Sequence, residues 1–342
     1  MNIEELTPAW LSEALGARVE TVTAEPVGTG QIGTCHRLTM TGDVTPTRML
    51  AKLPAPDPGT RELLANVYRS EMRFYDQIAP TVDIRVPATY YATMSPDSGD
   101  FTLLMEDLAP AEQGDQLVGC SVAQAEDAVV NLAGLHGPRW CDPTLLDIDG
   151  LQINGPDDAA LMAELYGPAT DIFVDGLAGL LSDEDVVTLR GVVEIIEGWA
   201  LARAERFGLV HGDYRLDTLM IPPDGTAGVV ALDWQTLSLA LPARDLAYFL
   251  GTGLSIEDRR AHERDLVAAY HGALTSYGVE GYSLEDCWED YRLAMAQGPL
   301  VSVFGCAYGT RTERGDRMFA AMVARSCAAI RDLDTLSLAA TG

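Results

Sequence analysis

Short runs of alternating apolar and polar residues fill the first third of the chain, and this period of two is typical of half-buried β-strands. Turn residues such as Thr41-Gly42-Asp43 separate the runs. Between them, an apolar period of three to four residues predicts one helix over Arg61–Ile78. The pattern therefore indicates a small, mostly antiparallel sheet that carries one helix, with strands expected at Val19–Val27, Cys35–Met40, Arg48–Leu53, Thr89–Met94 and Phe101–Met105.

The period becomes helical after Leu108, and a serine followed three residues later by an acid or amide precedes four of the expected helices. Helices are predicted near residues 122–136, 183–207, 256–277, 284–297 and 314–333. Two short β runs, Leu209–Val210 and Gly228–Leu232, interrupt the series. We therefore expect an α+β fold with two lobes. Residues 1–107 would form a small antiparallel-sheet N-lobe with one main helix, and residues 108–342 a larger, mostly helical C-lobe.

The chain has 342 residues, 47% of them hydrophobic and 22% charged, which predicts a globular protein with a large core. Its 23 Lys and Arg against 51 Asp and Glu give a formal net charge of −28, so we expect neither nucleic acids nor membranes as partners. The N-terminus lacks the regions of a signal peptide, and no apolar stretch is long enough to span a bilayer, which favours a cytoplasmic location. Six scattered cysteines without zinc-site spacing predict reduced thiols.

Gly28, Gly30 and Gly33 form a G-x-G-x-x-G motif. A dinucleotide-binding fold would need a helix to begin at Gly33 and an acid about 20 residues later. Residues 34–40 are instead strand-like, and Lys52 stands where the acid is needed. The layout favours a kinase-type nucleotide flap, in which the backbone N–H groups of the turn approach phosphates because no Cβ intervenes. The structural alternative is that the glycines form an ordinary hairpin turn. A further hypothesis, a dinucleotide oxidoreductase, is supported by the glycine motif alone.

Lys52 is the only lysine of the chain. Chance is one explanation, and a site that needs a compact point charge rather than a planar guanidinium is the other. Glu71 lies on the helix predicted after Lys52 and can hold the ammonium in place. A solvated charge is the alternative for Glu71, because Glu62 and Asp76 share the same helix.

Two aspartates each follow an apolar β run, and a carboxylate in such a setting needs a partner or a metal. Asp213 follows Leu209–Val210, and Asp233 comes 20 residues later, beyond a turn at Pro222–Gly225. A hairpin is expected to bring the two carboxylates to one end of a sheet. One of them could then accept or orient a hydroxyl proton while the other binds a divalent cation.

The stretches His211–Thr218 and Leu232–Gln235 resemble the catalytic and metal-binding motifs of the aminoglycoside phosphotransferase and choline/ecdysteroid kinase-like family, which has a protein-kinase-like fold. The resemblance extends over nearly the whole chain. It includes the glycine flap, Lys52, Glu71, Leu103–Leu108, Leu135–Trp140 and Ala243–Tyr248.

The resemblance implies a role for each matching residue. Asp213 would be the catalytic carboxylate facing the acceptor hydroxyl, and Asp233 the magnesium ligand. Lys52 with Glu71 would hold the α- and β-phosphates of ATP. The purine edge would meet the main chain of the joint between the lobes, at the Glu106 carbonyl and the Leu108 amide.

Arg215 matches the position where protein kinases place a lysine near the transferring phosphoryl group, and its guanidinium would stabilise developing charge there. A structural ion pair is the alternative for Arg215. The same resemblance implies that Asp245 braces the catalytic loop and that His211 is a buried anchor of that loop.

Thr218 departs from the family pattern, which has an asparagine as second metal ligand at this position. A threonine hydroxyl is a weaker neutral ligand, although hard cations accept hydroxyl oxygen. Either Thr218 still binds the metal, or Asp217 or a water completes the shell, or the metal site is weakened.

The sequence therefore predicts a magnesium-dependent kinase that moves the γ-phosphoryl group of ATP onto a hydroxyl of a small molecule. A nucleotide-binding protein with little or no transfer activity is the alternative, motivated by Thr218. Acidic residues of the second half could attract a cationic acceptor, but a solvated acidic surface explains them more simply. The acceptor and the oligomeric state are not readable from the sequence.

Overall fold

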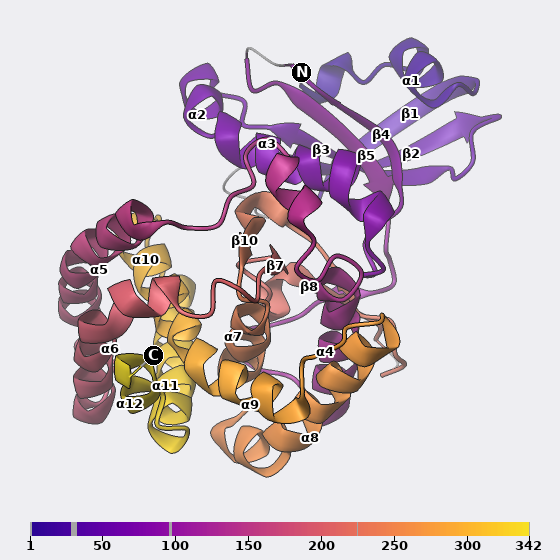
Figure 1. Ribbon diagram of the computed structural model, residues 1–342. Helices are drawn as coiled ribbons and strands as arrows, with labels where there is room; N and C mark the ends of the chain where they lie inside the picture. Colours follow the sequence, from indigo (N-terminus) through magenta and orange to yellow (C-terminus); the bar gives the residue numbers. More distant parts are fainter. Residues whose placement is uncertain (1, 29–32, 96–97, 224, 342) are drawn as a thin grey trace. The chain divides into compact units, whose positions relative to one another are not determined.

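The computed structural model describes residues 2–28, 33–95, 98–223 and 225–341 (Figure 1). The chain divides into two compact units. The first contains Met1–Thr81, Val86–Ala111 and Leu232–Leu237. The second contains Val82–Arg85, Glu112–Ala231 and Ser238–Gly342. The sequence predicts a single border after residue 107, whereas the structure assigns the short segment around Asp233 to the first unit.

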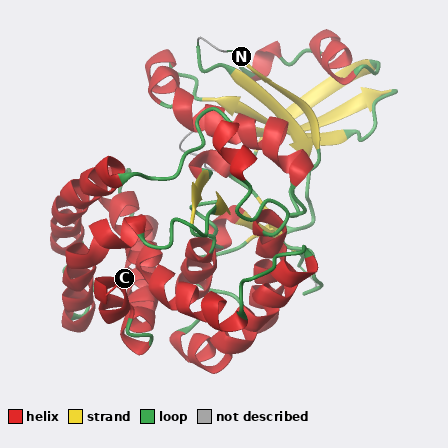
Figure 2. Ribbon diagram, viewed as in Figure 1, coloured by secondary structure: helices red, strands yellow, loops and turns green. Residues whose placement is uncertain are grey.

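The first unit is built on a five-stranded antiparallel sheet with the order β1-β2-β3-β5-β4 (Figure 2). Alternate residues of β3, Met49, Ala51 and Leu53, are buried in its hydrophobic core. Lys52 lies on the other face of β3, and in the sheet register it pairs with Cys35 on β2 and Leu103 on β5. The predicted strands are confirmed with small shifts of their ends, at β1 (Val19–Pro26), β2 (Gly33–Gly42), β3 (Arg48–Pro54), β4 (Thr89–Met94) and β5 (Phe101–Glu106).

The helical part of the first unit is more divided than the sequence predicts. Two α-helices, α2 (Pro58–Leu63) and α3 (Ala65–Arg73), stand where one helix over Arg61–Ile78 was expected. They separate at Leu64, whose φ of −91° and ψ of 2° leave the helical region. A wider, π-helical turn continues α3 over Phe74–Ile78, and α1 (Pro8–Leu15) precedes the sheet.

The second unit is mostly helical and contains two small sheets. Strands β7 and β10 form one pair, and β6, β8 and β9 form the other sheet in that order. The hairpin expected between Leu209–Val210 and Gly228–Leu232 is wrong, because β7 pairs with β10 while β9 pairs with β8, a strand that the sequence did not predict. Residue 224, in the turn between β8 and β9, lies outside the described part of the chain. The strands are β6 (Glu112–Gln113), β7 (Gly208–Val210), β8 (Leu219–Ile221), β9 (Val230–Ala231) and β10 (Ser238–Ala240).

Three of the five predicted helices of this unit match α4, α8 and α11 within one residue. The helix expected to residue 207 ends at Leu201 in α6, and the one expected over 284–297 ends at Leu293 in α9, before a separate α10. The sequence did not predict α5, α7, α10 or α12. Three of these, α5, α7 and α10, begin without a side-chain cap of the kind that opens the predicted helices. The helices are α4 (Val122–His136), α5 (Pro156–Gly176), α6 (Asp183–Leu201), α7 (Ala243–Gly253), α8 (Ile256–Ser276), α9 (Leu284–Leu293), α10 (Gln297–Tyr308), α11 (Glu313–Asp332) and α12 (Thr335–Thr341).

None of the helices in the described ranges is both long and apolar enough to cross a membrane.

Candidate active site

Lys52 and Glu71 form a tight ion pair in the first unit. The ammonium of Lys52, on β3, donates to Glu71 Oε1 on α3 at 2.6 Å, and the Glu71 side chain is only 2% exposed. Burial alone would lower the pKa of Lys52, but the charges of Glu71 and Asp233 outweigh it and raise that pKa. The only lysine of the chain therefore stays protonated and fixed in direction.

Asp233 lies beside the same ammonium. Its Oδ1 is 3.5 Å from Lys52 Nζ, too far for a strong hydrogen bond, and this buried oxygen has no hydrogen-bond partner among the described residues. The backbone of Asp233 is left-handed, with φ of 68° and ψ of 73°. A non-glycine residue held in this region carries strain of the kind found at functional sites. An unpartnered buried carboxylate oxygen fits a metal cation.

Asp233 does not belong to a preassembled cluster of His, Cys, Asp and Glu side chains in the described part of the chain. Within the described ranges, no three His, Cys, Asp or Glu side chains come together as a ready-made metal site. Mg²⁺ is usually held by one or two carboxylates with the rest of its shell supplied by waters and substrate phosphates, so a single carboxylate such as Asp233 is compatible with it.

The glycine motif is only partly described. Gly30 and its neighbours at positions 29, 31 and 32 lie outside the described residues. Gly28 has a φ of 71°, which favours glycine. A Cβ on Gly33 would meet the Leu53 carbonyl oxygen at 2.6 Å, so close pairing of β2 with β3 requires this glycine.

The predicted joint begins at the end of β5, where the amide of Glu106 donates to the Ala88 carbonyl at 2.9 Å. Leu108 lies two residues beyond the strand, and its carbonyl accepts from the Ala111 amide at 2.9 Å. Asp107 between them is held by Arg37 and Arg48, at 2.9 and 2.7 Å. Purine binding by Glu106 and Leu108 stays a prediction.

Asp213 lies in the second unit, after β7. Its Oδ1 accepts two hydrogen bonds, from Tyr248 OH at 2.8 Å and from Arg215 Nε at 2.9 Å. Arg215 Nη1 also donates to Asp217 Oδ2 at 2.8 Å. Arg215 is therefore placed in the ion pair that was its structural alternative, and its role near a phosphoryl group stays a prediction. Sequence reasoning missed Tyr248 as a partner of Asp213.

Asp245 holds the backbone of the same loop, as the sequence predicts. Its carboxylate accepts from the amides of His211 at 2.6 Å and Gly212 at 2.9 Å. His136 Nε2 lies 3.3 Å from the same carboxylate, and His136 Nδ1 lies 2.6 Å from Tyr270 OH. The side chains of Asp245, His136 and Tyr270 are buried, so a buried hydrogen-bond network holds the backbone of the loop.

Thr218 closes the loop on itself. Its hydroxyl lies 2.8 Å from the Asp213 carbonyl and 2.9 Å from the Arg215 carbonyl, and it accepts from the Arg215 amide at 3.2 Å. Asp217 is also engaged, because it accepts from the Gln116 amide at 2.9 Å and from Arg215. The Thr218 hydroxyl and the Asp217 carboxylate, the two groups considered as ligands of a second metal, thus both have hydrogen-bond partners within the protein. Metal binding by Thr218 stays a prediction.

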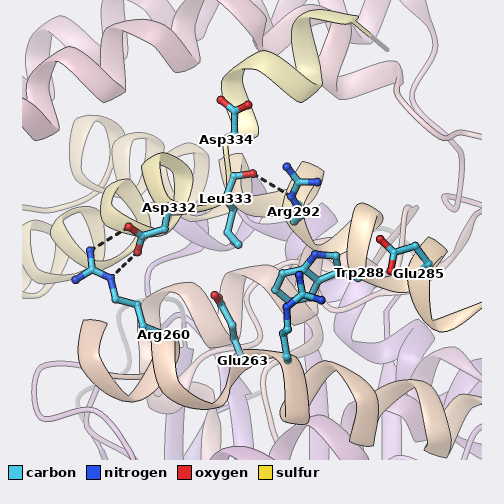
Figure 3. Close-up of a pocket in the computed structure, with 9 residues that line it drawn as sticks. Arg260, Glu263, Glu285, Trp288, Arg292, Asp332, Leu333 and Asp334 are labelled. Carbon is cyan, nitrogen blue, oxygen red and sulfur yellow. Dashed lines mark hydrogen bonds and ion pairs between the residues drawn. The ribbon is translucent and has the colours of Figure 1, made fainter.

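A separate cavity of about 460 Å³ lies between α8, α9 and the α11–α12 corner, and it is lined by none of the catalytic, nucleotide-binding or metal-binding residues predicted from the sequence (Figure 3). One ion pair joins two of its charged lining residues. Arg260 binds Asp332, and Arg264 lies 4.0 Å above the Trp288 ring. We therefore do not treat this cavity as the site.

Comparison with known proteins gives an independent result. A model of the phosphotransferase enzyme family matches residues 23–282, which is most of the chain. A curated mouse protein, acyl-CoA dehydrogenase family member 10, is 44% identical over 48 residues. That match covers 14% of this chain and 4% of the mouse protein, so the chain corresponds to only a short part of this relative.

Solved structures with related folds cover nearly the whole chain. Choline kinase from Cryptosporidium parvum has a TM-score of 0.62 at 10% identity, with 98% of this chain and 95% of that chain covered. A protein from Ralstonia eutropha provisionally named an aminoglycoside phosphotransferase has a TM-score of 0.57 at 18% identity, covering 99% and 98%. APH(2″)-IIa, in a ternary complex with streptomycin and ATP, has a TM-score of 0.53 at 14% identity, covering 96% and 98%. These likenesses show the kinase-like α+β fold.

Proposed function

This chain belongs to the phosphotransferase enzyme family, and on that premise we propose that it transfers the γ-phosphoryl group of ATP to a hydroxyl of a small molecule. One observation carries the proposal more than any other. The only lysine of the chain is locked onto buried Glu71 and lies 3.5 Å from the unpartnered Oδ1 of Asp233. A fixed cation beside a carboxylate oxygen that accepts no hydrogen bond from the described residues suits a phosphate and its metal ion.

In this proposal Lys52 binds the α- and β-phosphates, and Glu71 keeps its ammonium pointed at them. Asp233 holds Mg²⁺, which when bound neutralises charge on the phosphates. The left-handed backbone of Asp233 and its buried oxygen fix the direction from which the carboxylate binds. The glycine flap at Gly28, Gly30 and Gly33 supplies backbone N–H groups to the phosphates.

Asp213 accepts the proton of the acceptor hydroxyl as the hydroxyl oxygen attacks phosphorus. Arg215 keeps a positive charge next to this carboxylate and orients it, since the two side chains are 2.9 Å apart. Asp245 holds the His211 and Gly212 amides, so the loop that carries Asp213 is set before substrate arrives.

The experiment is transfer from γ-labelled ATP with Mg²⁺ to a panel of small alcohols. Choline, ethanolamine and streptomycin belong in the panel because structures with related folds carry those names. We expect labelled product with at least one alcohol. Asp213→Asn should reduce the rate by a factor of roughly 10² to 10⁴, the usual contribution of a general base.

Asp171→Asn is the control, because Asp171 is a surface acid, 61% exposed, whose partner is Arg190. It should leave the rate unchanged. Equal rates for Asp213→Asn and the wild type would end the assignment of Asp213.

A nucleotide-binding protein without transfer is the second candidate, and Thr218 favours it. The family pattern has asparagine at this position, and here the Thr218 hydroxyl is bonded inside its own loop. Calorimetry with MgATP separates the two candidates. Binding without product for any alcohol would support the second candidate, whereas binding with product would exclude it.

A further inference from the structure

The two oxygens of the Asp213 carboxylate have different surroundings. Oδ1 accepts from Tyr248 OH at 2.8 Å and from Arg215 Nε at 2.9 Å. Oδ2 accepts no hydrogen bond from any residue in the described ranges. The side chain is 24% exposed, so one oxygen is saturated by the protein and the other is open.

Tyr248 is a permanent donor. Its side chain is fully buried in α7. Burial, and next the negative charge of Asp213, raise the pKa of this phenol well above its usual value. The hydroxyl is therefore protonated at neutral pH and can donate to the carboxylate of Asp213.

One helix holds the catalytic loop at two points. Asp245 and Tyr248 are three residues apart on α7, so their side chains lie on the same face of the helix. Asp245 accepts from the loop amides of His211 and Gly212, while Tyr248 donates to the side chain of Asp213. The α7 helix thus fixes the backbone of the loop and the rotamer of its carboxylate together.

We infer that Tyr248 is a positioning residue which, with Arg215, holds Oδ1 of Asp213 so that Oδ2 is the oxygen that takes the acceptor proton. This inference rests on the proposed function. In the transfer step the acceptor O–H bond breaks and its proton goes to Oδ2. The acceptor oxygen forms a bond to the γ-phosphorus as the bond from that phosphorus to the bridging oxygen breaks, and ADP leaves.

A hydroxyl deletion tests the inference by steady-state kinetics with MgATP and an alcohol from the panel. Tyr248→Phe keeps the ring and removes the donor. We expect kcat to fall roughly tenfold or more, the equivalent of one hydrogen bond to a charged group, while KM for ATP stays within about twofold. In an Asp213→Asn background the same change should cause no further loss, because Tyr248 acts through that carboxylate.

Tyr291→Phe is the matched control. Tyr291 is also fully buried, and its hydroxyl also donates to a carboxylate, Glu263 Oε2, at 2.9 Å. It should lower stability as Tyr248→Phe does and leave kcat unchanged. If kcat is unaffected by Tyr248→Phe, or falls equally with Tyr291→Phe, the inference is overturned.

A readout without activity separates this inference from the proposed function. We expect a downfield proton NMR resonance for the Tyr248 hydroxyl that is absent from Tyr248→Phe and moves upfield in Asp213→Ala. If the wild type phosphorylates no alcohol of the panel, the proposed function fails while this resonance still tests the contact. A resonance that Asp213→Ala leaves unmoved would overturn the contact itself.

Discussion

Phe74 and Trp234 are stacked face to face within the first unit, with ring centroids 3.5 Å apart and ring planes 3° from parallel. Both side chains are fully buried. Phe74 begins the π-helical turn after α3, and Trp234 follows Asp233 directly. The Ser70 hydroxyl adds a hydrogen bond of 3.3 Å to the Trp234 carbonyl. Packing on α3 and the turn after it therefore fixes the segment that carries the candidate metal ligand.

Removing the Phe74 ring should loosen Asp233 as well as the core. Phe74→Ala is expected to cost about 3 to 5 kcal/mol of unfolding free energy, the usual range for a buried phenylalanine. It should also weaken MgATP binding, because Asp233 loses its support, and denaturant titration with calorimetry would measure the two effects. Phe173→Ala, at a fully buried ring of α5, is the control. An equal loss of MgATP affinity in both variants would contradict a specific role for the stack.

The Lys52–Glu71 pair should behave as a buried ion pair. Lys52→Met leaves the carboxylate of Glu71 buried and unpaired, so we expect a loss of about 3 to 5 kcal/mol of unfolding free energy. Lys52→Met with Glu71→Met removes both charges and should recover much of that loss, while MgATP binding stays weak. Urea unfolding of the three proteins gives the free energies. A double variant less stable than Lys52→Met would show that the pair is not the source of the cost.

We expect the carboxylate of Asp332 to account for part of the unfolding free energy that the protein loses in acid. Burial would raise its pKa, but hydrogen bonds from Arg260 and Arg259 outweigh burial and lower that pKa below the usual 3.8. Its contribution to stability is therefore complete above about pH 4 and is lost as the pH falls through the lower, folded-state value. Unfolding at pH 5 and pH 3 should show a smaller drop for Asp332→Asn than for the wild type. Asp265→Asn, at an exposed acid of α8, should match the wild type, and an equal drop in all three would contradict the assignment.

The sequence predicted the strands of the first unit well, and in β3 the period of two corresponds to alternate burial. Within that strand, Met49, Ala51 and Leu53 face the core. It failed for α7, an 11-residue helix that begins without a side-chain cap to mark its start.

Within the candidate site, motifs identified Lys52, Glu71 and Asp233, and the structure brings these three side chains together. The contact between Tyr248 and Asp213 was beyond sequence reasoning. The two residues are 35 positions apart on different elements, and a tyrosine in a buried helix is typical of ordinary core packing. The bonds of Thr218 within its own loop were missed for a related reason, because a motif gives residue types and not the direction of a hydroxyl.

Substitutions of Thr218 can show whether its hydroxyl binds a metal or stabilises the conformation of its own loop. Thr218 is 4% exposed, and its hydroxyl contacts the Asp213 carbonyl and the Arg215 amide. Thr218→Val keeps the shape and leaves those buried groups unpartnered, so we expect a loss of about 1 to 3 kcal/mol of unfolding free energy. The Mg²⁺ concentration for half-maximal MgATP binding should stay unchanged, because the hydroxyl is already occupied.

Two further variants make the result of Thr218→Val decisive. Thr218→Ser keeps the hydroxyl and should resemble the wild type in stability and in Mg²⁺ requirement. Thr218→Asn supplies the ligand of the family pattern, and if a weak metal site limits this protein it should bind MgATP more tightly and turn over faster. A tenfold rise in the Mg²⁺ requirement of Thr218→Val that Thr218→Ser does not share would instead make the hydroxyl a metal ligand. An unchanged requirement in all three variants would leave metal binding to Asp233 and the phosphates, with Thr218 acting on the geometry of the loop that carries Asp213.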